Sequence, residues 1–167
     1  MHTDRIALPL WTGVFQSKIW VLDDFWSLEF DQTLVPGRPN WGWKQYIRNT
    51  TARFRCTECG RTWPSNRVMV VFHMRLMYRQ GVVKVRRFRQ SCKICESAPM
   101  EMPKICYENV DILLENLVEK IRIKCYYEQL QTWDRPSRNV YVRSPHEPAN
   151  CEGCIEDICQ RNFPGFY

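Results

Sequence analysis

The sequence predicts an α+β fold, in which an antiparallel β hairpin or sheet carries one main helix. Three observations predict it: the spacing of the cysteines, two β-branched and aromatic segments in the middle of the chain, and one amphipathic segment after them. The chain has 167 residues, enough for one domain with its own core. Its 44% hydrophobic content excludes wholesale disorder.

Six of the nine cysteines fall into three Cys-x-x-Cys pairs, namely Cys56 with Cys59, Cys92 with Cys95, and Cys151 with Cys154. The total is odd, and the N-terminus has no signal-peptide core or cleavage site. No apolar run approaches the ~20 residues of a transmembrane helix. We therefore expect a chain in the cytoplasm or at the cytosolic face of a membrane. In that reducing environment, paired cysteines indicate metal binding rather than disulfides.

The first two pairs flank a predicted hairpin. The segment 67–74 is rich in β-branched and aromatic residues, Gly81 interrupts it, and 82–88 resumes with near alternation. A cysteine knuckle, two strands and a second knuckle is the layout of a zinc ribbon. The sequence thus predicts a zinc-ribbon-like hairpin whose first Zn²⁺ is bound by Cys56, Cys59, Cys92 and Cys95.

A second Zn²⁺ is expected near the C-terminal end, where His146 precedes Cys151 and Cys154. Cys159 is favoured as the fourth ligand because it is close in sequence, and Cys125 and His73 are the alternatives. For His73, an ordinary core or surface histidine on a strand is the favoured interpretation.

The segment 109–127 predicts the one main helix. Its apolar residues recur at helical spacing and should pack on the sheet, with Asn109 as the N-cap. They are Val110, Leu113, Leu114, Leu117, Val118, Ile121 and Cys125. Residues 1–45 are rich in tryptophan and predict short strands packed on the core. The expected division is therefore 1–45, a zinc-finger domain at 46–160, and a tail at 161–167.

The net charge of +6 is concentrated in one region. Between Arg53 and Lys93 there are eleven basic residues and one acid, a local charge of +10. This pattern favours phosphate contacts and base stacking by RNA. The candidate residues are Arg75, Arg79, Lys84, Arg86, Arg87, Phe88, Arg89 and Lys93. A solvated strand face, paired with acids elsewhere, is the competing interpretation.

Catalytic motifs are missing from the sequence: it has no glycine-rich phosphate loop, nucleophile elbow or His-Glu-x-x-His pattern. A deaminase-type zinc site would need His-x-Glu ahead of its cysteine pair, and the chain has His146-Glu147 instead. We therefore expect a protein that is not an enzyme and has no small-molecule substrate.

Several segments resemble the receptor-transporting protein family, which shares a three-CxxC zinc-finger domain with the zygote arrest proteins. The resemblance covers roughly residues 20–160. Its main segments are Gly42-Trp43-Lys44-Gln45-Tyr46, Phe54-Arg55-Cys56-Thr57-Glu58-Cys59, Trp63-Pro64-Ser65, Phe72-His73-Met74, Val85 to Cys92, Cys125-Tyr126, and His146 with Cys151-Glu152-Gly153-Cys154.

The resemblance implies an adaptor that helps odorant and bitter-taste receptors, which are heptahelical G-protein-coupled receptors, to reach the cell surface. One interferon-induced branch of the family implies an antiviral, RNA-binding role instead. Family members usually carry a C-terminal membrane anchor after a variable tail, whereas this chain ends at Phe166-Tyr167. The N-terminal helix of the family is expected to be shortened or recast here.

Overall fold

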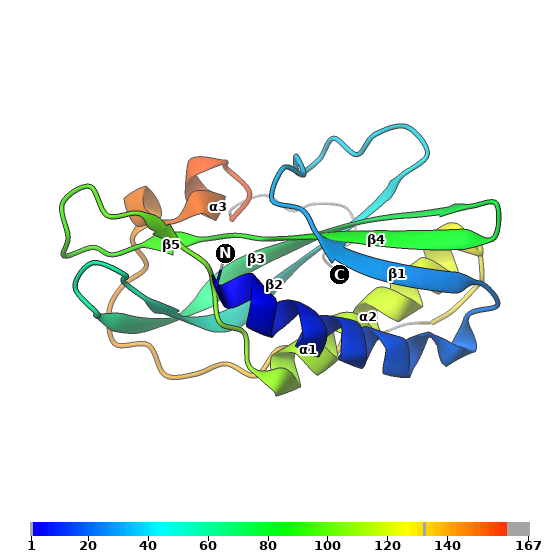
Figure 1. Ribbon diagram of the computed structural model, residues 1–167, viewed down its shortest axis with the longest axis horizontal. Coiled ribbons are helices and arrows are strands. Elements are labelled where there is room, and N and C mark those ends of the chain that lie inside the picture. The colour runs from blue at the N-terminus through cyan, green and yellow to red at the C-terminus, as the bar shows by residue number, and fades with distance from the viewer. Residues whose placement is uncertain (1, 132, 160–167) are drawn as a thin grey trace.

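The computed structural model describes residues 2–131 and 133–159. The strands lie between two long helices in the chain, and short helices lie near the C-terminal end (Figure 1). The elements in order are α1 (His2–Lys18), η1 (Ile19–Val21), β1 (Phe25–Phe30), β2 (Lys44–Arg55), β3 (Thr62–Met77), β4 (Gln80–Arg87), β5 (Gln90–Ser91), β6 (Met100–Glu101), α2 (Tyr107–Cys125), η2 (Pro148–Asn150) and α3 (Glu152–Ile155).

Four strands form the main sheet in the order β1-β4-β3-β2, and β5 pairs with β6 in a second, two-stranded sheet. β3 pairs antiparallel with both β2 and β4, while β1 lies parallel to β4. The predicted hairpin is therefore β3–β4. Gly81 lies within β4, opposite Trp26 of β1. A Cβ at Gly81 would lie 2.0 Å from the indole ring of Trp26, so glycine makes room for that buried side chain.

The predicted main helix is α2, and its apolar stripe packs on one face of the sheet as expected. Val110, Leu113, Leu114, Leu117 and Ile121 are all fully buried in the larger core. The predicted N-cap was wrong, because Cys106 holds that position. The buried Asn109 side chain instead donates to the Arg138 carbonyl oxygen and accepts from its backbone N–H.

The N-terminal segment differs from the prediction of strands alone. Residues 2–18 form α1, a helix of 17 residues, and only 25–30 form a strand. α1 lies beside α2 on the same face of the sheet (Figure 1). Trp11, Val14 and Phe15 bury its inner side in the larger core. The N-terminal segment of this chain therefore contains a long helix packed on the core. The predicted tail at 161–167 lies outside the described residues.

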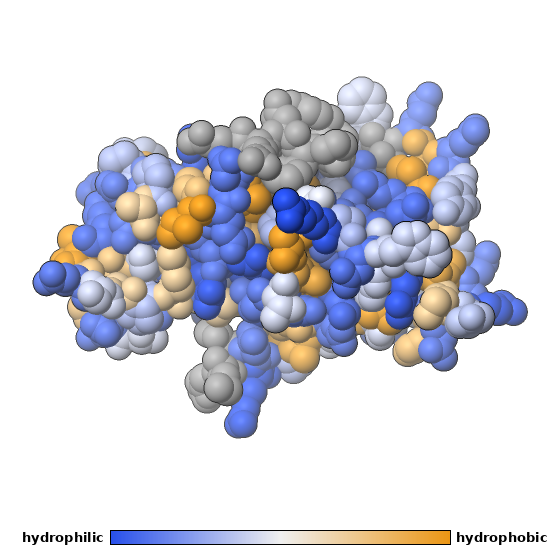
Figure 2. Space-filling view, turned by 90° about the horizontal axis from the view of Figure 1, so that it is seen from above, coloured by the Kyte–Doolittle hydropathy of each residue, from blue (hydrophilic) through white to orange (hydrophobic). Residues whose placement is uncertain are grey.

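The opposite face of the sheet carries α3 and the long connection 31–43 (Figure 1). Beneath α3 is a second, smaller core of Ile47, Met69, Val71, Phe88 and Ile158. The outer surface on this side is mostly hydrophilic, with small separate hydrophobic patches (Figure 2). In the described part of the chain, no helix combines the length and apolar character needed to cross a membrane.

Candidate metal centres and the basic hairpin

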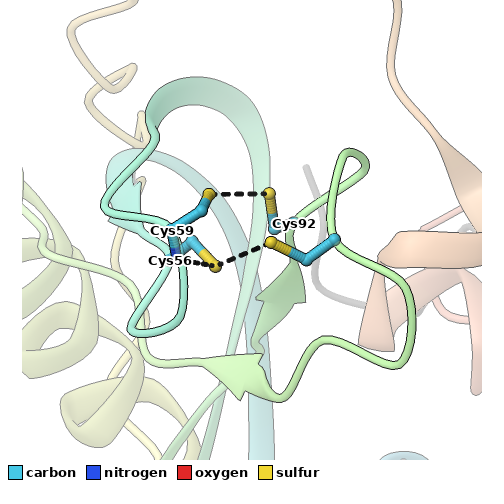
Figure 3. A group of neighbouring side chains, drawn as sticks. Cys56, Cys59 and Cys92 are labelled. Carbon is cyan, nitrogen blue, oxygen red and sulfur yellow. Dashed lines mark hydrogen bonds between the residues drawn. The ribbon is translucent and has the colours of Figure 1, made fainter.

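The first two cysteine knuckles face each other (Figure 3). Cys56 and Cys59 lie between β2 and β3, and Cys92 and Cys95 follow β5. The Sγ atoms of Cys56 and Cys95 are 3.8 Å apart, as are those of Cys59 and Cys92. All four sulfurs lie within 4.8 Å of one another. We call this group the four-cysteine cluster.

Hydrogen bonds hold the first knuckle in place. The Cys56 N–H donates to the Arg61 carbonyl at 2.8 Å, which closes the turn. The backbone N–H of Thr57 donates to the Glu101 carboxylate of β6 at 2.6 Å, and its hydroxyl also bonds Glu101. Since β6 pairs with β5, this buried carboxylate links the first knuckle to the strand that leads into the second.

His146, Cys151, Cys154 and Cys159 form the second group, which we call the histidine–cysteine cluster. His146 Nε2 lies 3.3 Å from Cys154 Sγ, and the sulfurs of Cys151 and Cys159 are 3.7 Å apart. A Cβ at Gly153 would lie 2.7 Å from Cys159 Sγ. A side chain at position 153 would therefore collide with the sulfur of Cys159, and glycine leaves room for that sulfur to join the cluster.

The spacing in both clusters fits tetrahedral zinc. Four ligands at a Zn–S distance of about 2.3 Å place neighbouring sulfurs about 3.8 Å apart, and a Zn–N bond shortens the mixed edge to about 3.5 Å. A disulfide would need sulfurs at about 2.05 Å. The observed separations of 3.7 and 3.8 Å match the metal geometry. The chain thus carries two zinc sites, as predicted.

The thiols of these clusters differ in acidity. Burial raises the pKa of Cys92, but the N–H groups of Cys95 and Ile94 and the Arg61 guanidinium outweigh it and lower the pKa to about 6. The hydrogen bond from Cys159 and the N–H of Cys154 lower the pKa of Cys151 to about 5. Cys92 and Cys151 therefore favour the thiolate near neutral pH, and thiolates are the form that binds metal.

The structure separates the three candidates for the fourth ligand of the second site. Cys159 lies in the histidine–cysteine cluster. His73 is buried in the sheet, where its Nε2 is 3.0 Å from Gln45 Oε1. Cys125 packs against the larger core at the end of α2, where burial raises its pKa to about 11. Neither alternative belongs to a metal cluster among the described residues.

Three of the eight residues predicted to contact RNA lie in the interior of the fold. Arg86, Arg87 and Phe88 are buried, so their side chains are not presented at the surface. Arg86 donates to the Leu34 carbonyl and to Glu156, both at 2.8 Å. Arg87 forms an ion pair with Asp4 of α1. These partners are 52 to 83 residues away, which a local charge count cannot reveal.

The other candidates are divided among different surroundings. Arg89 binds Glu152 of α3 through both its backbone and its guanidinium, and Lys84 lies within 3.8 Å of Glu29 and Asp31. At the hairpin turn, Arg79 pairs with Asp24, and Arg75 lies over the Trp43 ring. Lys93 is exposed at the other end, beside the four-cysteine cluster. The eight residues therefore do not form one exposed surface.

Glu152 is a residue that sequence reasoning missed. It is buried next to Cys151, and it accepts hydrogen bonds from the backbone N–H and guanidinium of Arg89. Its carboxylate also lies 3.6 Å from the Arg86 guanidinium. The available signal was an acid inside a Cys-x-x-Cys pair, in a chain that also carries a cluster of arginines at 86, 87 and 89. Glu152 fastens the histidine–cysteine cluster to β4.

Comparison with known proteins gives a consistent family. The model of a zinc-binding domain, the three-CxxC zinc ribbon, matches residues 49–157. The chain is 37% identical to receptor-transporting protein 3 of Mus musculus over 171 aligned positions, covering 99% of this chain and 36% of the relative. It is 34% identical to mouse receptor-transporting protein 2, covering 89% of this chain and 69% of the relative.

A third relative is receptor-transporting protein 1 of Homo sapiens, which is 33% identical over 89% of this chain and 58% of its own length. The chain thus spans about a third of the first relative's length and somewhat more than half of the human relative. No solved structure matches the chain.

Proposed function

Because the chain belongs to the receptor-transporting protein family, we propose that it is a zinc-stabilised adaptor that promotes the folding and cell-surface delivery of G-protein-coupled receptors of the odorant and taste type. It acts by protein–protein contact on the cytosolic side of the membrane, not by catalysis. The names of the relatives support a role in the transport of receptors. That these receptors are heptahelical is our proposal.

The observation that carries this function is the pair of four-ligand clusters in and beside the matched zinc-binding domain. We assign one zinc ion to Cys56, Cys59, Cys92 and Cys95, and the other to His146, Cys151, Cys154 and Cys159. Four protein ligands complete a tetrahedral shell, which is the arrangement of structural zinc, whereas catalytic zinc keeps a position for water or substrate. The metals then serve to fix a binding surface.

The alternative of RNA binding through the hairpin finds less support. Of its eight candidate residues, three are buried, and Lys84, Arg79 and Arg89 have acidic partners within the chain. An RNA strand would have to displace those carboxylates before it reached the three cationic side chains. We therefore favour the adaptor, which recognises a partner protein through the surface of the folded domain.

The test is a cell-surface delivery assay. The chain, fused to a membrane anchor, is co-expressed with a poorly exported odorant receptor, and surface receptor is measured by antibody labelling of intact cells. We expect the anchored chain to raise surface receptor and the free chain to do so weakly, because anchoring raises the local concentration. Anchored Cys92→Ser should be inactive, and Cys106→Ser, at an exposed cysteine outside both clusters, should be active. Inactivity of the anchored wild type across several receptors would contradict the adaptor function.

A further inference from the structure

A groove of about 680 Å³ lies between the two metal clusters. Residues 62–67 of β3 form one wall, and the extended segment 141–147 forms the other. Gln90 and Ser91 lie between them. Arg61 at one end contacts Cys92 Sγ at 3.9 Å, and His146 at the other end belongs to the histidine–cysteine cluster. Zinc on both sides would hold this groove open.

Three cationic side chains that line the groove form no ion pair within the described residues. Arg67, Lys93 and Arg143 line it, are exposed, and have no side-chain ion pair or hydrogen bond within the described part of the chain. Glu147 is the one acid in the lining. In contrast, Arg86, Arg87 and Arg89 all bind carboxylates of this chain. Three positive charges against one carboxylate around a concave site produce a net positive field that attracts an acidic ligand.

One wall of the groove is an open strand edge. β3 pairs with β2 from Thr62 onward, but with β4 only from Val70 onward. Arg53 of β2 exchanges backbone hydrogen bonds with Lys104, so its contact with Pro64 is a non-hydrogen-bonded pair. The Pro64 carbonyl, and by alternation the N–H and carbonyl of Thr62, therefore point away from β2. A proline fits such an edge because it has no N–H to leave unpaired.

Aromatic side chains complete the recognition surface. Trp63 is held by a hydrogen bond from Nε1 to Gln90 at 2.9 Å and by stacking on Phe54 at 5.5 Å. Tyr141 stands on the other wall with 83% of its surface exposed. Aromatic rings such as these contribute a large contact area at low entropic cost, because their side chains have only two rotatable bonds.

We propose that this groove binds an acidic segment of a partner protein in extended conformation, with its main chain along the β3 edge and its carboxylates against Arg67, Lys93 and Arg143. The assignment rests on the proposed adaptor function in one respect, namely that the segment belongs to the transported receptor. A peptide suits the groove better than RNA does, because Thr62 and Pro64 offer main-chain donors and acceptors along a strand edge.

The binding test uses the purified, zinc-loaded chain and fluorescein-labelled probes, with fluorescence anisotropy as the readout. The probes are a decapeptide of alternating glutamate and threonine, the same peptide with lysine for glutamate, and a single-stranded oligouridine of equal length. The groove variant is Arg67→Glu with Arg143→Glu. The matched control is Arg5→Glu with Arg38→Glu, an equal charge change at exposed residues outside the groove.

We expect the acidic peptide to bind and the lysine peptide not to bind. The groove variant should bind the acidic peptide about tenfold more weakly or worse, and the control within about twofold of the wild type. Bound peptide should also slow exchange of the Thr62 amide proton, measured by NMR. The exchange of the Thr62 amide proton tests whether the peptide pairs with the strand edge. Retained zinc content confirms that the variants are folded.

Three results would overturn the proposal. One is equal binding of the two peptides. Another is oligouridine that displaces the acidic peptide while the Thr62 amide shows no protection, which would assign the groove to RNA. The third comes from the surface-delivery assay: if the anchored groove variant delivers receptor as well as the wild type, the segment does not come from the receptor. The adaptor function would stand in that case, so the two failures can be told apart.

Discussion

The two zinc clusters are built in different ways. The four-cysteine cluster joins knuckles that lie more than 30 residues apart in the sequence, with β3, β4 and β5 between them. The histidine–cysteine cluster takes all the side chains proposed as its ligands from residues 146–159 and sits on the sheet through the short helix α3. The first ion therefore closes the hairpin itself, whereas the second orders a short segment that covers the smaller core.

The largest effect is expected from loss of the first cluster. Cys92→Ser removes a buried ligand, and structural zinc stabilises small domains on the order of 10 kcal/mol. We expect the variant to bind one zinc ion fewer than the wild type, as measured by metal analysis. Circular dichroism should show no cooperative thermal unfolding transition. Cys106→Ser, at an exposed cysteine outside both clusters, is the matched control. A folded Cys92→Ser protein with the melting temperature of the wild type would show that this cluster is not structural.

Loss of the second cluster should have a smaller and more local effect. His146→Ala should remove the other zinc ion while the main sheet, α1 and α2 stay folded, because their core does not include α3. We expect faster amide hydrogen exchange in residues 146–159 and around Phe88, with little change in α2. Global unfolding on loss of this ligand would contradict the distinction between the two clusters.

Glu152→Gln tests how the second cluster is attached to the sheet. The change keeps the size of the side chain but leaves the buried Arg86 and the partly exposed Arg89 without their shared carboxylate. We expect the free energy of unfolding to fall by about 2 kcal/mol, below the usual cost of breaking a buried pair because Arg89 is screened by solvent.

Chemical denaturation measures that cost, with exposed Glu96→Gln as the control. Zinc content should stay at two ions, because Glu152 is not a ligand. A loss of zinc from Glu152→Gln would mean that the carboxylate itself binds metal.

The smallest effect is expected at His73. His73→Gln should keep both zinc ions, because this residue contacts Gln45 rather than a metal cluster. Burial lowers the pKa of His73 below its ordinary value of 6.5, so the unfolded chain takes up the proton more readily. Neutral His73 therefore contributes stability above pH 6.5 that is lost as the pH falls toward its folded pKa.

The readout for His73 is the free energy of unfolding at pH 7 and at pH 6. The variant lacks this titration, so its stability relative to the wild type should improve on acidification. An unchanged difference between the two proteins would show that His73 is not desolvated in the fold.

Local sequence patterns were enough to predict the cysteine pairs, the β3–β4 hairpin and α2, because each depends on residues close together in the chain. The fourth ligand of the second cluster was also a local inference. The helix α1 was missed because Pro9 and Gly13 interrupt its pattern, and the tryptophans of residues 1–45 favoured strands.

The surroundings of the arginines could not be predicted, because they depend on contacts that are distant in sequence. Arg87 meets Asp4 and Arg89 meets Glu152 only after α1 and α3 have packed on the sheet. Charge counts along the chain located the basic region correctly. They could not show that its arginines fasten the fold together while Arg67 and Arg143 remain free in the groove.

Native mass spectrometry of the intact chain tests the central claim that two zinc clusters organise this domain. The chain is measured at neutral pH with and without a strong chelator, and its cysteines are alkylated after denaturation. We expect the mass of the chain plus two zinc ions, nine alkylated cysteines, and unfolding when the chelator removes the metal. A metal-free chain that stays folded, with cysteines blocked from alkylation by disulfides, would contradict it.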